Sequence, residues 1–261
     1  MLKQRLSEKV EKFVAAALPL SHWGETYFNI RLMEFELADG LFNGVFSGGK
    51  GAALDIGCGI GLASVYLSDF FDRVDGTDID EVGVAFNVKR AAPLAGAEII
   101  GDLGLRDVRL HCGDTLDFLR ARPARYDLIF SHFVLEHVEH LESLVAATYE
   151  SLKPGGRALH IVPNTHDTIV QLLLANLDPL WENLKRAWRN RGRKDRCDVR
   201  RMGNLFAPIT HSEFLSDYRK QFEVNAAEHY LFPMIAAGFK VRDIKPMREH
   251  AYGILIEKPV A

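Results

Sequence analysis

The chain has 261 residues, of which 48% are hydrophobic and 26% charged, with a formal net charge of -3. These ordinary globular proportions exclude disorder as the main state, and the length suits one domain, or one domain with a cap. No apolar run approaches the roughly 20 residues of a membrane-spanning helix, and the charged start, residues 1–9, is unlike a signal peptide. The widely spaced cysteines, Cys58, Cys112 and Cys197, favour a reducing, cytoplasmic compartment over a disulfide framework or a structural zinc site.

The first part of the chain carries the pattern of amphipathic helices. Apolar residues recur at spacings of three and four over residues 2–18 and again over residues 27–42, which predicts two helices. The segment 47–51, Ser-Gly-Gly-Lys-Gly, is a predicted loop. We therefore expect an N-terminal helical cap over residues 1–46.

After this loop, short apolar strands alternate with helical stretches. This alternation implies right-handed crossovers and a mainly parallel sheet with helices on both faces. We assign residues 47–163 to this core. The predicted strands are 52–56, 73–78, 108–112, 126–131 and 157–162, and the predicted helices between them are 61–70, 81–94, 115–120 and 138–152.

The alternation stops at Pro163. Residues 164–209 are predicted to form a helical insertion, in which Leu177, Trp181, Leu184 and Trp188 make one apolar stripe. Residues 210–261 return to the core pattern. A capping box at 210–213 opens helical sequence that ends near Gly238, and two closing strands are predicted over 239–244 and 251–256.

The segment 53–61, Ala-Leu-Asp-Ile-Gly-Cys-Gly-Ile-Gly, is the strongest indication of a ligand site. A buried strand ends in a loop with glycine at alternate positions, and the following helix offers free N–H groups. A tight strand-to-helix turn without a ligand is the alternative. The second strand ends at Asp78, where a carboxylate can accept hydrogen bonds from both ribose hydroxyls. Alternatively, Asp78 is a solvated strand end and Asp80 caps the next helix; both interpretations can hold.

Four further segments occur in order along the same part of the chain. They are Cys-Gly-Asp-Thr at 112–115, a fourth strand with its loop at 126–138, Leu-Lys-Pro-Gly-Gly-Arg at 152–157 and Val-Pro-Asn at 162–164. Together with the glycine loop they resemble the class I S-adenosylmethionine-dependent methyltransferases, over roughly residues 50–163. The resemblance implies an α/β, Rossmann-like, seven-stranded, mostly parallel sheet with helices on both faces, an N-terminal helical cap and a helical insertion after the fifth strand.

The resemblance also implies which residues bind the cofactor, S-adenosyl-L-methionine. A first group surrounds the methionine part, a second holds the ribose and adenine, and a third lines the floor near the sulfonium. The implied residues are Asp55, Gly57, Gly59 and Gly61 in the first group, Asp78, Ile79, Asp114 and Thr115 in the second, and Ser131 and His132 in the third.

Two histidines are candidate catalytic residues. A sulfonium methyl is already electrophilic, so alignment and removal of solvent supply most of the rate, and a hydroxyl nucleophile also needs a base. His132 and His166 follow the fourth and fifth strands, at the sheet edge where α/β proteins bind ligands. For each of them a hydrogen-bonded or solvated structural role is the alternative. We rank His137 lower, because Leu-Glu-His-Val recurs in the family as a structural segment.

A metal site is considered at the residues that follow the fourth strand. Glu136, His137, Glu139 and His140 match the residue types of a Glu/His metal cluster that small-RNA 2′-O-methyltransferases of this superfamily use. Leu-Glu-His-Val is, however, common in relatives without a metal. We therefore predict none.

The insertion is strongly basic. Residues 181–201 hold nine basic and three acidic side chains, a net charge of +6, so the rest of the chain sums to -9. The favoured interpretation is a solvated lid whose tryptophan stripe packs on the sheet domain. The alternative is a surface for an anionic or lipophilic small-molecule substrate, with peripheral membrane contact through residues 172–201. Nucleic acid is disfavoured because the basic run is short and the rest is acidic. The fourth strand also lacks the Asn/Asp-Pro-Pro-aromatic pattern of base methylation.

The sequence therefore predicts a methyltransferase that moves a methyl group to a small-molecule acceptor, at oxygen, by in-line displacement. The segments Val134–Val138 and Lys153–Gly156 resemble the branch that contains quinone-biosynthesis O-methyltransferases, which also holds C- and N-methyltransferases. The alternatives are a non-catalytic cofactor-binding protein of the same fold, a nicotinamide oxidoreductase, or a methyltransferase acting on a lipid-linked or RNA substrate. The spacing Gly-x-Gly-x-Gly argues against the oxidoreductase, because a dinucleotide loop has Gly-x-Gly-x-x-Gly.

Overall fold

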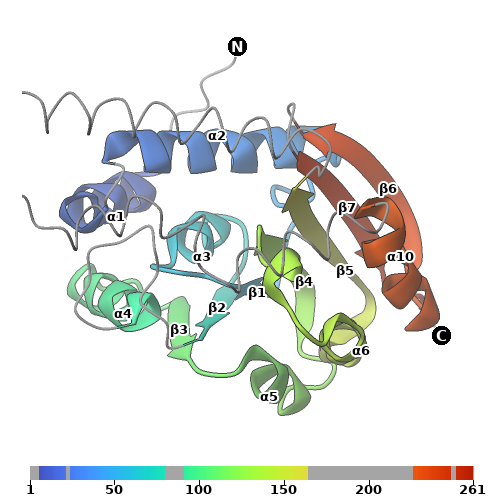
Figure 1. Ribbon diagram of the computed structural model, residues 1–261. Coiled ribbons are helices and arrows are strands. Elements are labelled where there is room, and N and C mark those ends of the chain that lie inside the picture. Colours follow the sequence, from blue (N-terminus) through green and yellow to red (C-terminus); the bar gives the residue numbers. More distant parts are fainter. Residues whose placement is uncertain (1–5, 22–23, 80–90, 164–225, 248–250, 261) are drawn as a thin grey trace, which may run out of the picture. The chain divides into compact units, whose positions relative to one another are not determined.

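The computed structural model describes residues 6–21, 24–79, 91–163, 226–247 and 251–260. Its centre is a seven-stranded sheet with the order β3-β2-β1-β4-β5-β7-β6 (Figure 1). The strand pairs β1–β2, β2–β3, β1–β4 and β4–β5 are parallel, and β6–β7 is antiparallel. The predicted seven-stranded, mostly parallel sheet is thus confirmed. The strands are β1 (Ala52–Ile56), β2 (Arg73–Asp78), β3 (Val108–Cys112), β4 (Tyr126–His132), β5 (Leu152–Pro163), β6 (Lys240–Met247) and β7 (Ala251–Glu257).

Helices cover both faces of this sheet. Helices α2 (Glu25–Leu41) and α3 (Leu62–Leu67) lie on one face, and α5 (Thr115–Arg120) and α6 (Leu141–Ser151) lie on the other (Figure 1). On the first face, the ring of Phe35 in α2 packs edge-on against Phe130 of β4, with centroids 5.7 Å apart. The other helices of the described residues are α1 (Glu8–Ala17), α4 (Ala92–Asp102) and α10 (Ala226–Ala236), with 3-10 turns at Leu18–Leu20 and Leu135–His137.

Burial along the strands explains why the sequence places β1 and β4 at the centre. Four of the five residues of β1 are buried, as a strand covered on both faces requires. In β6, by contrast, exposed and half-buried residues alternate, which is the pattern of an edge strand. The sheet reverses its direction of growth between β1 and β4. Ligands of open α/β sheets bind outside the carboxyl ends of the strands at such a switch point.

Some predicted elements differ from the structure. Helix α1 begins at Glu8, after Ser7, whose hydroxyl accepts a hydrogen bond from the Val10 N–H. Residues 2–5 of the predicted helix lie outside the described residues. Helix α4 was not predicted with these bounds, because it overlaps only the last residues of the predicted helix 81–94. Pro93 lies in its first turn. Residues 81–90 of the predicted helix lie outside the described residues. Strand β5 is longer than predicted because it starts at Leu152.

The Lys-Pro-Gly-Gly segment inside β5 nevertheless behaves as a turn-like irregularity. Register moves from Tyr126 opposite Leu152 to Leu128 opposite Arg157, so residues 153–156 bulge out of the ladder. Gly155 has a φ of +76° there, which favours glycine. The regular pairing with β4 thus resumes at Arg157, where the predicted strand begins.

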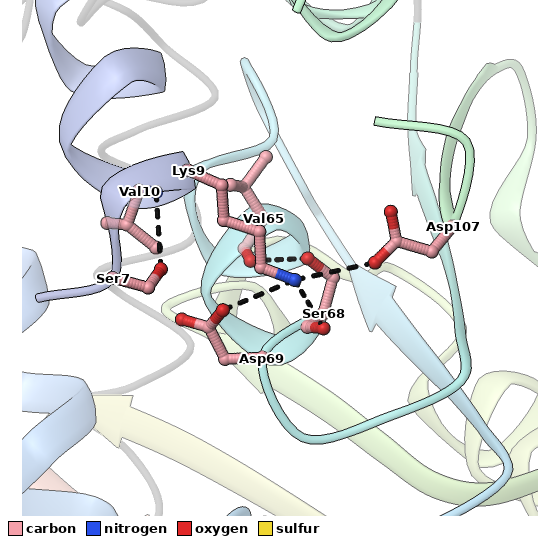
Figure 2. A network of polar contacts seen from close by, with 7 residues as sticks. All are labelled: Ser7, Lys9, Val10, Val65, Ser68, Asp69 and Asp107. Carbon is pink, nitrogen blue, oxygen red and sulfur yellow. Dashed lines mark hydrogen bonds and ion pairs between the residues drawn. The ribbon is translucent and has the colours of Figure 1, made fainter. Parts of the chain in front are cut away.

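Helix α1 is fixed to the core by a half-buried lysine side chain with several oxygen partners (Figure 2). The Lys9 ammonium donates to the Ser68 carbonyl oxygen at 2.5 Å and lies 3.2 Å from Asp69 Oδ1 and 3.4 Å from Asp107 Oδ2. These partners come from the end of α3 and from the loop before β3. One side chain thus connects the N-terminal cap to two core segments.

The chain divides into two compact units, one of residues 1–162 and 230–261 and the other of residues 163–229. The first contains the sheet and the cap. Nearly all of the second lies outside the described residues. The predicted helical insertion at 164–209, its basic segment, the capping box at 210–213 and the candidate His166 therefore stay predictions, as do the four domain boundaries.

Candidate active site

The loop after β1 turns sharply at three glycines. Gly57, Gly59 and Gly61 have φ angles of +70°, +51° and +96°, a region that glycine enters without strain. The N–H groups of Gly57 and Cys58 both donate to the carbonyl oxygen of Thr77, at 2.8 and 3.1 Å. The loop is therefore fixed to the end of β2 by its own backbone.

The three glycines differ in what surrounds them. A Cβ on Gly57 would lie 2.2 Å from Cγ2 of Val134, and a Cβ on Gly61 would lie 2.6 Å from Cδ1 of Leu110. A Cβ on Gly59 would meet no atom within 4 Å. Packing alone thus explains Gly57 and Gly61, whereas the backbone at Gly59 faces open space that a ligand can approach closely.

A cavity of about 210 Å³ lies beside this loop. Its walls come from β1 and the loop, from the start of α3, from α2 and from the end of β4. It combines aromatic surface with one cation and one carboxyl group. The lining residues are Tyr27, Arg31, Phe35, Asp55, Gly57, Cys58, Ile60, Leu62, Ala63, His132 and Phe133.

Asp55 is the carboxyl group of the cavity wall. Its side chain is 2% exposed, and the Ser64 hydroxyl donates a hydrogen bond to Oδ2 at 2.7 Å. Burial raises the pKa of Asp55 to about 7, while the Ser64 hydrogen bond acts in the opposite direction. Asp55 therefore titrates near neutral pH, unlike an exposed aspartate.

Asp78 ends β2 next to the same loop. Its Oδ2 accepts a hydrogen bond from the N–H of Gly59 at 2.7 Å, and its Oδ1 accepts one from the N–H of Ile79 at 2.8 Å. The carboxylate is thus held in one orientation at the glycine that faces open space. The side chain of Ile79 itself is 47% exposed.

Three charged or polar side chains meet on the α2 side of the cavity. Nη1 of Arg31 donates to Oε2 of Glu34 at 2.9 Å, and Nε2 of His132 lies 3.0 Å from the same oxygen. Arg31 Nη1 and His132 Nε2 are 3.5 Å apart. The guanidinium of Arg31 also lies over the rings of Tyr27 and Phe133, at 5.4 and 5.1 Å from their centroids.

The pKa directions of this group follow from burial and from the three contacts. Burial lowers the pKa of His132; the hydrogen bond to Glu34 opposes this shift and the charge of Arg31 adds to it. Burial raises the pKa of Glu34, but the contacts with His132 and Arg31 outweigh it, so the net pKa lies below the usual value. At neutral pH the group therefore consists of a cation, a carboxylate and a neutral imidazole.

The predicted adenine residues lie at the end of β3. Asp114 is exposed and caps α5, because its Oδ1 accepts a hydrogen bond from the N–H of Asp117 at 2.8 Å; Thr115 is the first residue of that helix. The N–H of Gly113 donates to the carbonyl oxygen of Asp78 at 2.8 Å. The ends of β2 and β3 are thus adjacent, and the assigned roles of Asp114 and Thr115 stay predictions.

Ser131 does not line the cavity, although it was predicted at its floor. Its side chain is fully buried, and its Oγ lies 2.8 Å from Nδ1 of His160 on β5. Because side chains alternate along a strand, Ser131 faces the opposite side of the sheet from His132. Burial lowers the pKa of His160 to about 4, so this buried ring is neutral.

Sequence reasoning missed several residues of this region. Glu34, Phe35 and Phe133 were not singled out, and His160 was taken only as part of a strand. Glu34 could have been found from the helical periodicity of α2. The helix buries one face, and a carboxylate on a buried face needs a partner. The buried residues of α2 are Phe28, Leu32, Glu34, Phe35 and Ala38. The partner His132 is distant in sequence and so was not evident.

Metal-binding clusters were sought within the described residues. No group of three or more His, Cys, Asp or Glu side chains there is arranged to hold a metal ion. Oε1 of Glu136 lies 3.9 Å from Nε2 of His137.

A larger hollow of about 280 Å³ lies at the opposite, amino ends of the strands. It is lined in part by Lys50, Asp127 and Lys153. The Lys153 ammonium is 2.6 Å from Oδ2 of Asp127, which also accepts the N–H of Ala52 at 2.8 Å. These charges are used to hold β1, β4 and β5 together. The cavity at the carboxyl ends is therefore the better candidate for the ligand site.

Known proteins resemble this chain over the same region. A family model described as a methyltransferase domain matches residues 33–216. The ubiquinone biosynthesis O-methyltransferases of Idiomarina loihiensis and Xylella fastidiosa are 31% and 32% identical over 119 and 123 residues. These matches cover 46% and 47% of this chain, and 42% and 45% of the two relatives. The matched region thus spans less than half the length of these curated relatives.

A solved structure shares the fold over almost the whole chain. The crystal structure of a SAM-dependent methyltransferase from Aquifex aeolicus superimposes with a TM-score of 0.51 at 15% identity, covering 96% of this chain and 97% of that one. At this identity the likeness establishes the fold alone. Across the described helices, none is both long and apolar enough to cross a membrane.

Proposed function

Because the chain belongs to the methyltransferase domain family, we propose that it transfers a methyl group from S-adenosyl-L-methionine to a small-molecule acceptor, at oxygen. The observation that carries this proposal is the cavity beside the glycine loop, which Arg31 and Asp55 line. In the same loop, the N–H of Gly59 donates to the carboxylate of Asp78. The oxygen acceptor rests on the name of two relatives, O-methyltransferases about 31% identical to this chain over less than half their length.

The residues around the cavity fit S-adenosyl-L-methionine. Gly59 leaves its backbone open to a ligand, and the Asp78 carboxylate stands at that glycine with acceptor capacity for ribose hydroxyls. Arg31 is the cation of the cavity wall and suits the carboxylate of the methionine part. Asp55, with a pKa of about 7, also lines the cavity and offers an acceptor for the methionine amino group. S-adenosyl-L-methionine has no phosphate group, so the glycine loop does not need to bind one.

The bound cofactor supplies an electrophilic methyl group on a positively charged sulfur. The protein orients the acceptor and excludes water, which a cavity walled by Tyr27, Phe35 and Phe133 favours. A hydroxyl acceptor must also lose its proton. His132 lines the cavity and is neutral at pH 7 because burial lowers its pKa, so we assign it as the proton acceptor. His166, the second candidate, lies outside the described residues and stays a prediction.

We further propose an acceptor of anionic or lipophilic character and a cytoplasmic location. The basic segment 181–201 and its apolar neighbours support the first, including peripheral membrane contact through residues 172–201. The widely spaced cysteines of the sequence support the second, and within the described residues Cys58 and Cys112 form no disulfide.

Two measurements test the proposed function. Titration calorimetry should detect binding of S-adenosyl-L-methionine and S-adenosylhomocysteine, and NAD should bind more weakly. Transfer of a labelled methyl group should then be followed with a panel of phenols, catechols, amines and carbon acids. Absence of cofactor binding at millimolar concentration contradicts the proposal. Binding without transfer to any acceptor favours a non-catalytic cofactor-binding protein, and transfer only to amines contradicts the oxygen assignment.

A further inference from the structure

We propose that Glu34 is a positioning residue for His132: its carboxylate receives the Nε2–H of the imidazole, so that Nδ1 is the nitrogen that takes the acceptor's proton. This inference rests on the proposed function and adds a residue of the N-terminal cap to the reaction centre. It is carried by the contact between Oε2 of Glu34 and Nε2 of His132, at 3.0 Å.

The contact is buried on both sides. The side chains of Glu34 and His132 are 7% and 9% exposed. The imidazole is also enclosed by rings, since the centroid of Phe133 lies 4.3 Å away and that of Phe35 lies 5.7 Å away at an interplanar angle of 89°. Packing and the Glu34 contact together leave the ring little freedom to rotate.

The protonation of the ring follows from its partner. An ionised carboxylate only accepts hydrogen bonds, so a neutral imidazole with Nε2 at 3.0 Å from it carries its hydrogen on Nε2. The lone pair is then on Nδ1. Arg31 Nη1 lies 3.5 Å from Nε2 and could donate to that nitrogen only in the other tautomer, but its shorter contact is the one of 2.9 Å to Glu34.

A purely structural role for Glu34 is the competing explanation. Arg31 and Glu34 are three residues apart on α2, and such a pair can brace a helix by itself. A brace of this kind is stable on a helix surface and gains nothing from burial, which is costly for a carboxylate. The additional contact with a cavity-lining histidine distinguishes Glu34 from a simple helix brace.

The proton balance is simple. As the acceptor oxygen forms its bond to the methyl carbon, the carbon–sulfur bond breaks and its electron pair stays on sulfur. The acceptor's O–H proton passes to Nδ1 of His132, which becomes an imidazolium. Glu34 stabilises that cation through the Nε2–H contact. No oxidant or further reactant is required.

The tautomer of His132 can be measured without a known acceptor. The whole chain is labelled with ¹⁵N-histidine, bound to S-adenosylhomocysteine, and examined by long-range ¹H–¹⁵N correlation spectroscopy, with His132→Gln used to assign the signal. The expected result is a neutral His132 in the Nε2–H form. An Nδ1–H form in the wild-type protein overturns the proposal, whether or not any variant folds.

Two variants on α2 separate positioning from a general charge effect. Glu34→Gln loses the charge, and its amide can donate as well as accept, so His132 should lose its tautomer preference and its pKa should fall further, since Glu34 raises it. Glu36→Gln removes a half-buried carboxylate two residues along the same helix and should leave both signals unchanged. The other ionisable groups of the cavity, Tyr27, Arg31, Asp55 and Cys58, remain in both variants.

Kinetics provide a second readout once any hydroxyl acceptor is turned over. Glu34→Gln should lower kcat by about tenfold or more with little change in the KM for S-adenosyl-L-methionine. The acidic limb of the pH profile should also move to lower pH, and Glu34→Asp should recover part of the rate. Unchanged ¹⁵N signals and an unchanged pH profile in Glu34→Gln overturn the proposal. The proposed function is tested separately by cofactor binding, and absence of that binding contradicts it.

Discussion

The assignment of Asp78 to the ribose predicts a specific loss of affinity in Asp78→Asn. Each carboxylate oxygen already accepts one backbone hydrogen bond, from Gly59 at 2.7 Å or from Ile79 at 2.8 Å, and each retains a lone pair for a hydroxyl. Asparagine keeps only one acceptor oxygen. Losing one hydrogen bond to a charged group costs about 1.5–3 kcal/mol. The Kd for S-adenosylhomocysteine should therefore rise about 10- to 150-fold.

Calorimetry with two ligands separates a lost ribose contact from a disturbed loop. The wild-type protein should prefer S-adenosylhomocysteine over its 2′,3′-dideoxy analogue, and this preference should be about 10- to 150-fold smaller in Asp78→Asn, which keeps one acceptor oxygen. Asp107→Asn, which removes a carboxylate that contacts Lys9 far from the cavity, is the matched control and should behave as wild type. The reasoning is refuted if Asp78→Asn keeps the full preference for the hydroxyls, because both ligands then lose affinity by the same factor.

Three further predictions concern other parts of the chain. Arg31→Met removes the cation of the cavity wall, so the Kd for S-adenosylhomocysteine should rise about tenfold or more. Calorimetry with 5′-methylthioadenosine, which lacks the carboxylate, should give an unchanged Kd; equal losses for both ligands would contradict a carboxylate contact. Lys9→Met removes three oxygen contacts of a partly buried ammonium and should lower the free energy of unfolding by about 1 kcal/mol, measured in urea. An unchanged value would mean that α1 is held by apolar packing alone. The pKa of His160 is about 4 in the folded protein, compared with its ordinary value of 6.5. As the pH is lowered, the unfolded chain therefore binds a proton at this residue before the folded protein does. The free energy of unfolding should fall by about 3 kcal/mol between pH 6.5 and pH 4. In His160→Gln this part of the pH dependence should disappear from urea titrations at pH 7.5 and 4.5.

Local patterns were sufficient for most of the sheet. The run Arg73–Asp78 is the observed β2, and Val108–Cys112 is the observed β3, because apolar strands bounded by turn residues carry their own signal. Helix α4 was missed because it begins with a proline and contains Gly96 and Gly101, which usually indicate a break. Gly96 is needed for another reason: a Cβ there would lie 2.0 Å from the carbonyl oxygen of Ile60. That close approach is a tertiary contact that no local pattern reports.

The cofactor class and the fold were predicted from ordered segments, and the family match and the observed sheet confirm both. Side-chain direction at the end of β4 was harder to predict. Ser131 and His132 are neighbours in sequence, but one contacts His160 inside the sheet and the other lines the cavity. The period of two along a strand requires this separation, and only the position of α2 decides which face holds the ligand.

The amino-acid sequence alone determined the glycine loop, its strand and the acidic end of the next strand. Each of these depends on backbone conformations and residue types within a few positions of one another. The tertiary structure alone decided that Arg31 and His132, 101 positions apart in the chain, lie 3.5 Å from each other and both contact Glu34. The helix of the cap and the end of the central strand acquire this arrangement only when the helix packs on the sheet. The packing buries the Glu34 carboxylate, and a buried carboxylate is stable only with hydrogen-bond or charged partners.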